Sequence, residues 1–172
     1  VLIDLNLVQK KGRKYALTSY GENLANSFHA DAPLHMVLYD MLHLHPGIVR
    51  ASRSQFSHGH YSDAIFNAFR AVEVFVKKKT GISGSIGQSL MADVFRLDHP
   101  ILKINPLVKD ADKDEQEGFK FLFMGAMRGI KNPKSHDEIV QKDPFRTLQY
   151  LAFASLLAKR VEESQLTVSE RK

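Results

Sequence analysis

A long amphipathic stretch, from His60 to Lys79, constrains the fold more than any other feature of this sequence. Its apolar residues recur every three or four positions, which is the spacing of one face of an α-helix. Three lysines fill the last turn and Gly81 follows them, a pattern typical of a helix C-terminus. The sequence therefore predicts a core helix here. Its apolar positions are Tyr61, Ala64, Ile65, Ala68, Phe69, Val72, Phe75 and Val76.

Helical patterns also precede and follow this stretch. Apolar residues at helical spacing predict a connecting helix after Asp31 and a second helix from Ile48 to about His58. Farther along, the charged residues 110–117 lead into the apolar run 118–127. The length of that run and its shortage of β-branched residues favour a buried helix, so we expect residues 119–127 to lie in the core.

The last long helix is predicted from Asp143 to about Glu163. Asp143 and Pro144 form a cap and first-turn pair, which favours a helix start. The helix is apolar on more than one face, so we expect it to be buried on two sides, one of them a subunit interface. Taken together, these patterns predict an all-α helical bundle.

The N-terminal segment has a different pattern. Two extended runs surround the basic turn Lys10-Lys11-Gly12-Arg13-Lys14 and predict a β-hairpin. A capping box then starts a helix from Tyr20 to about Ser27. Hairpin and helix together resemble the wing and last helix of a winged-helix domain, and the resemblance implies a DNA contact. Because the chain opens on Val1, we expect the recognition helix of such a module to precede it.

These patterns divide the chain into four segments. Residues 1–28 form the partial winged-helix segment and residues 29–46 a connecting helix and linker. Residues 47–165 form the helical domain, and residues 166–172 are a polar tail that we expect to be frayed.

Composition limits the classes of protein to consider. The 172 residues are 44% hydrophobic and 25% charged, as in one globular domain with a small appendage. The chain has no Cys and so no disulfide, thiolate nucleophile or Cys-ligated metal. No apolar run approaches the roughly 18 residues of a membrane span, so we expect no membrane partner, and the absence of Cys leads us to expect a protein of the reducing cytoplasm. The net charge of +5 permits a phosphate-bearing partner.

One short segment, residues 128–137, combines cations, an amide and an imidazole. A residue that precedes proline avoids the α region, so the helix should end near Lys131. Asn132 can then cap a new turn that begins at Pro133. The sequence predicts a kink between two core helices at this point.

His136 falls in the first turn after this kink. The positive end of a helix disfavours imidazolium, so we expect a neutral ring that can act as a general base on a hydroxyl. Three cations lie beside it in the sequence and would hold a phosphate and offset developing charge. These are Arg128, Lys131 and Lys134.

Plainer interpretations exist for these features. Asn132-Pro133 can be a simple helix cap, with His136 an ordinary surface residue. Glu73 and Lys77, four residues apart, are predicted to form a surface ion pair. Two His-x-His pairs invite a metal site, but no carboxylate accompanies them at ligand spacing, so we predict no metal and no other cofactor. The pairs are His43, His45, His58 and His60.

Several motifs, in this order, resemble the Ymh-type hypothetical proteins, a bacterial and phage group related to HEPN domains. The resemblance covers about residues 43–163. Within it, Lys131-Asn132-x-x-x-His136 is similar to the Arg-polar-x-x-x-His motif of HEPN domains, helical bundles that are often metal-independent endoribonucleases. The motifs are Leu44-His45-Pro46, Gly59-His60-Tyr61-x-Asp63-Ala64, Asp114-Glu115-Gln116-x-Gly118-Phe119 and Gly125-Ala126-Met127-x-Gly129-Ile130-Lys131-Asn132-Pro133-x-x-His136.

The resemblance implies a homodimer that cleaves RNA at a composite site, in phage defence or toxin-like growth arrest. His136 would be the base or acid, Asn132 would orient it, and Lys131 would take the place of the arginine that holds the scissile phosphate. Arg128 and Lys134 would bind substrate, and the product would be a 2′,3′-cyclic phosphate.

Lysine departs from the family pattern because it lacks the bidentate fork of arginine. The alternative is therefore a non-catalytic HEPN module that dimerises and binds nucleic acid within a winged-helix regulator.

Overall fold

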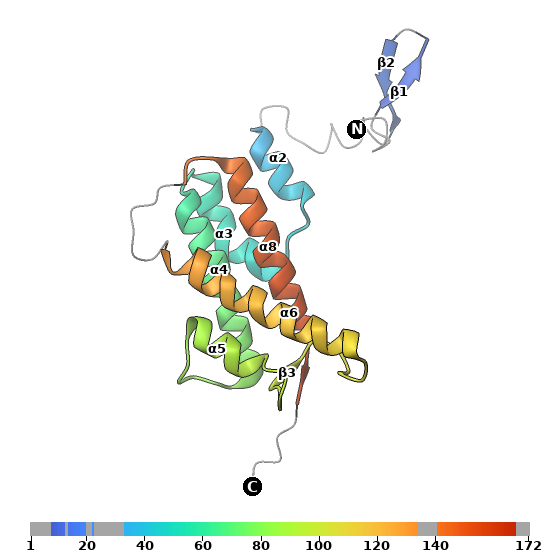
Figure 1. The fold of residues 1–172 in the computed structure, drawn as a ribbon. Coiled ribbons are helices and arrows are strands. Elements are labelled where there is room, and N and C mark those ends of the chain that lie inside the picture. The colour runs from blue at the N-terminus through green and yellow to red at the C-terminus, as the bar shows by residue number, and fades with distance from the viewer. Residues whose placement is uncertain (1–7, 13, 20–21, 23–32, 134–140, 168–172) are drawn as a thin grey trace. The chain divides into compact units, whose positions relative to one another are not determined.

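In a computed structural model of the chain, the structure describes residues 8–12, 14–19, 22, 33–133 and 141–167. The chain divides into two compact units, Val1–Met41 and Leu42–Lys172. The described part is mostly helical, with little strand, and this confirms the all-α prediction (Figure 1).

The first unit contains the predicted hairpin. Strands β1 (Val8–Lys11) and β2 (Lys14–Leu17) pair antiparallel, and Gly12 in the tight turn has a φ of 63°. Helix α2 spans Leu34–Met41. The helix predicted from Tyr20 to Ser27 falls largely outside the described residues.

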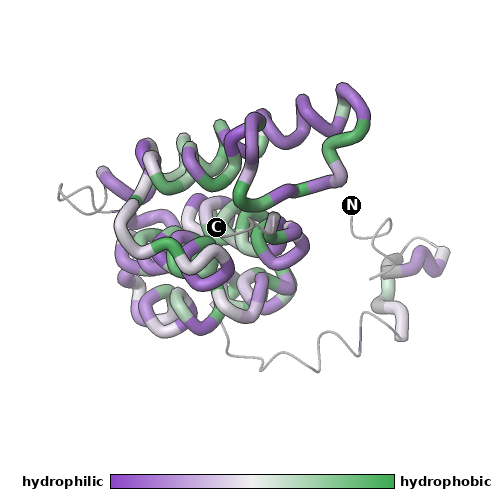
Figure 2. The backbone as a smooth tube through the Cα atoms, turned by 90° about the horizontal axis from the view of Figure 1, so that it is seen from below, coloured by the Kyte–Doolittle hydropathy of each residue, from purple (hydrophilic) through white to green (hydrophobic). Residues whose placement is uncertain are grey.

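Three long helices form the centre of the second unit. Helix α4 (Tyr61–Thr80) packs on α3 (Pro46–Ser57) and on α8 (Pro144–Glu163). Gly81 ends α4 in the left-handed conformation, with a φ of 74°, as its sequence position predicted. The Asp143 carboxylate caps α8 by accepting from two backbone N–H groups of the first turn. These three helix predictions are confirmed. In Figure 2, hydrophilic and hydrophobic residues alternate along the helices, as amphipathic packing requires.

The remaining elements cover one end of this bundle. Helix α5 (Gly87–Val94) packs on α6 (Asp110–Ala126), where the rings of Phe95 and Phe123 stack with centroids 4.3 Å apart. Strand β3 (Leu102–Lys103) pairs antiparallel with β4 (Gln165–Leu166). Strands of two residues have no periodicity to detect, and the sequence did not indicate them. None of the helices in the described part has the length and apolar character to cross a membrane.

The prediction that residues 119–127 all lie in the core was wrong in part. Phe123 and Met127 are fully buried, but Phe121 and Leu122 are 58% and 43% exposed. A helix that packs on one side can bury only one stripe of a continuous apolar run, because successive side chains point around the axis. The apolar run therefore contributes both to the core and to the surface.

Gln116, within the Asp114-Glu115-Gln116 motif, has a structural role. Its amide is buried and accepts from Ile104 N at 2.9 Å. It also donates to the carbonyls of Leu102 (3.0 Å) and Phe95 (3.2 Å). A buried amide with partners on both its oxygen and its nitrogen holds the chain around β3 against α6.

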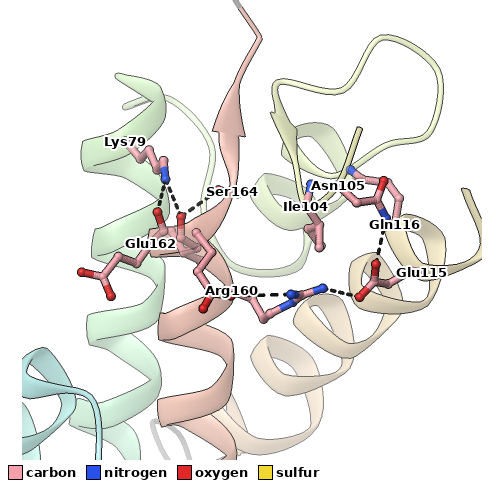
Figure 3. A network of polar contacts seen from close by, with 10 residues as sticks. Lys79, Ile104, Asn105, Glu115, Gln116, Arg160, Glu162 and Ser164 are labelled. Carbon is pink, nitrogen blue, oxygen red and sulfur yellow. Dashed lines mark hydrogen bonds and ion pairs between the residues drawn. The ribbon is translucent and has the colours of Figure 1, made fainter. Parts of the chain in front are cut away.

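A neighbouring polar network holds α8 (Figure 3). Arg160 pairs with Glu115, and Asn105 Nδ2 donates to the same carboxylate at 2.9 Å. Lys79 Nζ donates to the carbonyls of Val161 and Glu162, each at 2.7 Å, and so satisfies the C-terminal end of α8.

Candidate functional site

The candidate site begins where α6 widens into a π-helical turn, η1 (Met127–Lys131). Asn132 N donates to Met127 O at 3.1 Å, the five-residue spacing of a π turn. The helix ends near Lys131 as predicted, but Asn132 keeps helical angles (φ −62°, ψ −46°), so the expectation that the residue before proline avoids the α region is wrong here. Pro133 lacks an N–H and would crowd an ordinary turn, and the wider turn accommodates it.

Lys131 is held by a buried carboxylate on α4. Its Nζ lies 2.6 Å from Glu73 Oε2, and Gly87 N donates to the same oxygen at 3.1 Å. Lys77 Nζ lies 3.5 Å from the other carboxylate oxygen. The Glu73–Lys77 pair exists, but the prediction that it lies on the surface was wrong, because only 9% of the Glu73 side chain is exposed. We call Glu73, Lys77 and Lys131 the Glu73 cluster.

Two opposing effects act on the Glu73 carboxyl. Burial alone would raise its pKa. The hydrogen bond and charge of Lys131, the Gly87 N–H and the charge of Lys77 together hold the pKa below its ordinary value. Glu73 is therefore ionised at neutral pH, and its single negative charge faces two ammonium groups. The cluster keeps a net positive charge beside η1.

Sequence reasoning missed the partnership of Glu73 with Lys131. A signal was present, because Glu73 lies on the buried stripe of α4, one turn from Phe69 and from Val76. A carboxylate on a buried stripe needs a cationic or hydrogen-bonding partner. Only the tertiary structure shows that the partner is Lys131.

The structure describes three of the five predicted site residues, and of these only Lys131 belongs to the Glu73 cluster. Arg128 is exposed and donates to Gln88 Oε1 at 3.2 Å. Asn132 is exposed at the end of η1. Lys134 and His136 lie outside the described residues.

Both flanks of residues 134–140 are held by α4. Before this segment, Lys131 binds Glu73, and after it Gln141 N donates to Ser62 Oγ at 2.8 Å. A rise of about 1.5 Å per residue puts Ser62 and Glu73 roughly 16 Å apart along the helix axis. Lys131 and Gln141 therefore both contact α4, at well-separated points along it.

Helix α8 carries an exposed apolar surface. Phe145 and Leu156, each 48% exposed, fall on the same side of α8, whereas Leu151 and Leu157 are fully buried. The prediction that this helix is apolar on more than one face is therefore confirmed. A hollow of about 350 Å³ lies between α8 and η1, and its lining includes Ile130, Tyr150 and Phe153.

The His-x-His pairs contribute to helix ends. His45 Nδ1 accepts from Gly47 N at 3.1 Å and caps α3, and His58 Nδ1 lies 2.7 Å from Ser54 O at the other end of that helix. Among the described residues, no three His, Asp or Glu side chains gather as a metal site would require.

These features define a class: a helical bundle with a π-helical turn and a cationic cluster on its central helix. Residues 42–161 match the model of the family described as "Protein of unknown function (Hypoth_ymh)", and the chain belongs to this family. No curated protein and no solved structure matches the chain.

Proposed function

We propose that the protein is a metal-independent endoribonuclease of the HEPN type that acts as a homodimer. The observation that supports this most is the fixed position of Lys131. A π turn places it at the end of α6, and Glu73 on α4 holds its ammonium group within the Glu73 cluster, whose net charge is positive. π turns occur often at functional sites, and preorganised cations favour a transition state with developing negative charge.

In the proposed reaction, His136 removes the proton of a ribose 2′-hydroxyl. The 2′-oxygen then forms a bond to phosphorus while the bond from phosphorus to the 5′-oxygen breaks. The imidazole of the second subunit gives a proton to the leaving 5′-oxygen, so that the products are a 2′,3′-cyclic phosphate and a 5′-hydroxyl. Asn132 orients His136, and Lys131 with Arg128 and Lys134 holds the phosphate.

The exposed side of α8 supports the dimer. Phe145 and Leu156 expose apolar surface next to the hollow at Ile130. A contact there between two copies would bury this apolar surface and bring the two η1 turns close together. The second subunit would then complete the site.

A second candidate function is a non-catalytic HEPN module within a winged-helix regulator. One observation favours it: the Lys131 ammonium already binds a buried carboxylate at 2.6 Å, which reduces its capacity to hold a phosphate. The hairpin, which carries Lys10, Lys11 and Lys14, would supply a DNA contact.

The test of nuclease activity uses end-labelled RNA in EDTA with the wild type, His136→Ala and His99→Asn. His99 is an exposed histidine with a positive φ, which asparagine tolerates, so His99→Asn is a matched control. We expect cleavage with cyclic-phosphate ends from the wild type and the control, and none from His136→Ala. Equal cleavage by all three, or none by the wild type on any RNA, would contradict the proposal.

The test of the second function measures binding of duplex DNA. Under that hypothesis the full-length protein binds DNA in a salt-dependent manner, Lys10→Ala/Lys11→Ala weakens the binding, and His136→Ala leaves it unchanged. A full-length protein, with the module expected to precede Val1, that binds no DNA would exclude it.

A further inference from the structure

A groove runs between α3 and α4, on the solvent side of the bundle, with a volume of about 440 Å³. Its polar and aromatic lining comes from both helices. The residues that matter here are Gly47, Arg50, Asn67, Arg70, Phe75 and Lys78.

The groove has cations without carboxylate partners. Arg50, Arg70 and Lys78 are exposed, and none of them forms an ion pair within the part of the chain that the structure describes. Elsewhere in the same unit, Lys113 and Lys120 pair with carboxylates one turn away on their own helix. Three uncompensated positive charges in one groove favour a polyanion.

An aromatic ring forms part of the groove. Phe75 is half-buried and packs directly over the backbone of Gly47, where an added Cβ would lie 2.2 Å from Phe75 Cζ. The ring also lies against that of His45, with centroids 5.5 Å apart. These two contacts hold the ring in place, and the ring stays partly exposed in the groove. A fixed ring beside cations is the arrangement that binds single-stranded nucleic acid, with bases stacked on the ring and phosphates held by the cations.

The groove and the Glu73 cluster share helix α4. Arg70 lies three residues before Glu73, so the two side chains are neighbours on the helix surface. Lys77 is four residues beyond Glu73, and Lys78 lines the groove. One helix thus carries the groove on one side and the Glu73 cluster on the adjacent side.

We propose that the groove between α3 and α4 binds single-stranded RNA and leads it to the candidate site. Arg50, Arg70 and Lys78 contact phosphates, and Phe75 stacks on a base. The half-buried amide of Asn67 is placed to hydrogen-bond a base edge or a 2′-hydroxyl. The identity of this strand as the substrate rests on the proposed nuclease function, whereas the binding itself does not.

The test measures the affinity for labelled single-stranded RNA by fluorescence anisotropy, in a His136→Ala background so that no RNA is cleaved. Arg50→Ala/Arg70→Ala is compared with Arg96→Ala/Lys113→Ala, which removes the same charge elsewhere. We expect the affinity to fall at least tenfold in the groove variant and less than twofold in the control. The plot of log association constant against log salt concentration should become less steep by about 1.4 in the groove variant. Each lost contact with a phosphate of a single strand accounts for roughly 0.7, and the variant loses two.

Equal affinities of the two double variants would overturn the proposal. So would a groove variant that loses binding of duplex DNA and keeps that of RNA, because the groove would then fit a duplex. Circular dichroism and thermal unfolding check the fold of each variant. If the alanine pair does not fold, Arg50→Gln/Arg70→Gln carries the test, and Phe75→Leu separately tests stacking, with an expected loss of about fivefold or more.

Cleavage separates this inference from the proposed function. In the active background, the groove variant should cleave a dinucleotide as the wild type does and long RNA more slowly. If the wild type cleaves no RNA but the groove variant loses RNA binding, the nuclease function fails and the groove assignment stands. If the groove variant binds and cleaves long RNA like the control, the groove assignment fails and the nuclease function stands.

Discussion

Glu73 on α4 and Lys131 on η1 form an ion pair of 2.6 Å in which both side chains are largely removed from solvent. The pair connects the central helix to the end of α6, and Lys77 and the Gly87 N–H complete the environment of the carboxylate. A carboxylate in this position serves both stability and the placement of a cation, because its shorter ion pair, with Lys131, forms only when η1 is docked.

Replacing Glu73 by Gln is expected to destabilise the protein by about 2 kcal/mol, since two ammonium groups lose their carboxylate in a partly buried site. Glu117→Gln is the matched control, because Glu117 pairs with Lys120 at the surface and should cost well under about 1 kcal/mol. Urea unfolding of the two variants measures the difference. Equal losses would contradict a special role for Glu73.

The contribution of Glu73 is expected to depend on pH. Its pKa in the folded protein lies below its ordinary value, so the unfolded chain binds more protons in acid. The free-energy difference between the wild type and Glu73→Gln should therefore be complete above about pH 4.3, the ordinary value for Glu, and should diminish as the pH falls through the lowered pKa. Urea unfolding from pH 7 to pH 3 measures it, and a difference that grows in acid would contradict this account. The backbone N–H groups of Lys109 and Val108 also lower the pKa of the Asp112 carboxyl. This carboxyl changes the stability of the wild type and of Glu73→Gln by the same amount, so it cancels in the difference.

Gln116→Leu is expected to cost about 3 kcal/mol. The leucine leaves the Ile104 N–H and the Leu102 and Phe95 carbonyls without their partner in a buried site. Gln88→Leu, at a solvent-exposed hydrogen bond, should change the free energy of unfolding by less than about 1 kcal/mol. Denaturant unfolding of both proteins provides the comparison. An unchanged free energy of unfolding in Gln116→Leu would show that the Gln116 hydrogen bonds are dispensable.

Gly47→Ala is expected to destabilise the protein by about 1–3 kcal/mol, because the new methyl group overlaps the Phe75 ring. Shortening the ring side chain should relieve the overlap, so Gly47→Ala/Phe75→Leu should be less destabilised than the two single substitutions predict when added. Thermal unfolding of the double-mutant cycle measures the coupling. Strict additivity would show that the two residues do not interact.

Leu156→Lys is expected to convert a dimer into a monomer, because it places a charge on the apolar side of α8 that the proposed interface buries. Leu166→Lys is the control, since Leu166 is exposed to the same extent, 48%, on β4. Sedimentation velocity distinguishes the two states. A wild type that sediments as a monomer, or a Leu156→Lys variant that remains dimeric, would contradict the interface.

The long helices were predictable because their periodicity and end signals lie within the sequence itself. The stripe from Tyr61 to Val76 and the stop at Gly81 predicted α4, and Asp143 with Pro144 predicted the start of α8. The β-hairpin was likewise visible from its turn residues. Such signals are local, so each can be recognised without knowledge of the rest of the chain.

The tertiary structure alone decided which helix faces meet. It paired Glu73 with Lys131, which lies 58 positions away, and it placed Gln116 under β3. It also left Phe121 and Leu122 exposed, although the apolar run that contains them was predicted to lie in the core. It also made η1 a π turn that keeps Asn132 helical, where the local rule for a residue before proline predicted that it would leave the α region. The physical reason is that the partner of a side chain depends on packing between distant segments. Local patterns in the sequence show the periodicity of each helix, but they do not show which distant residues come into contact.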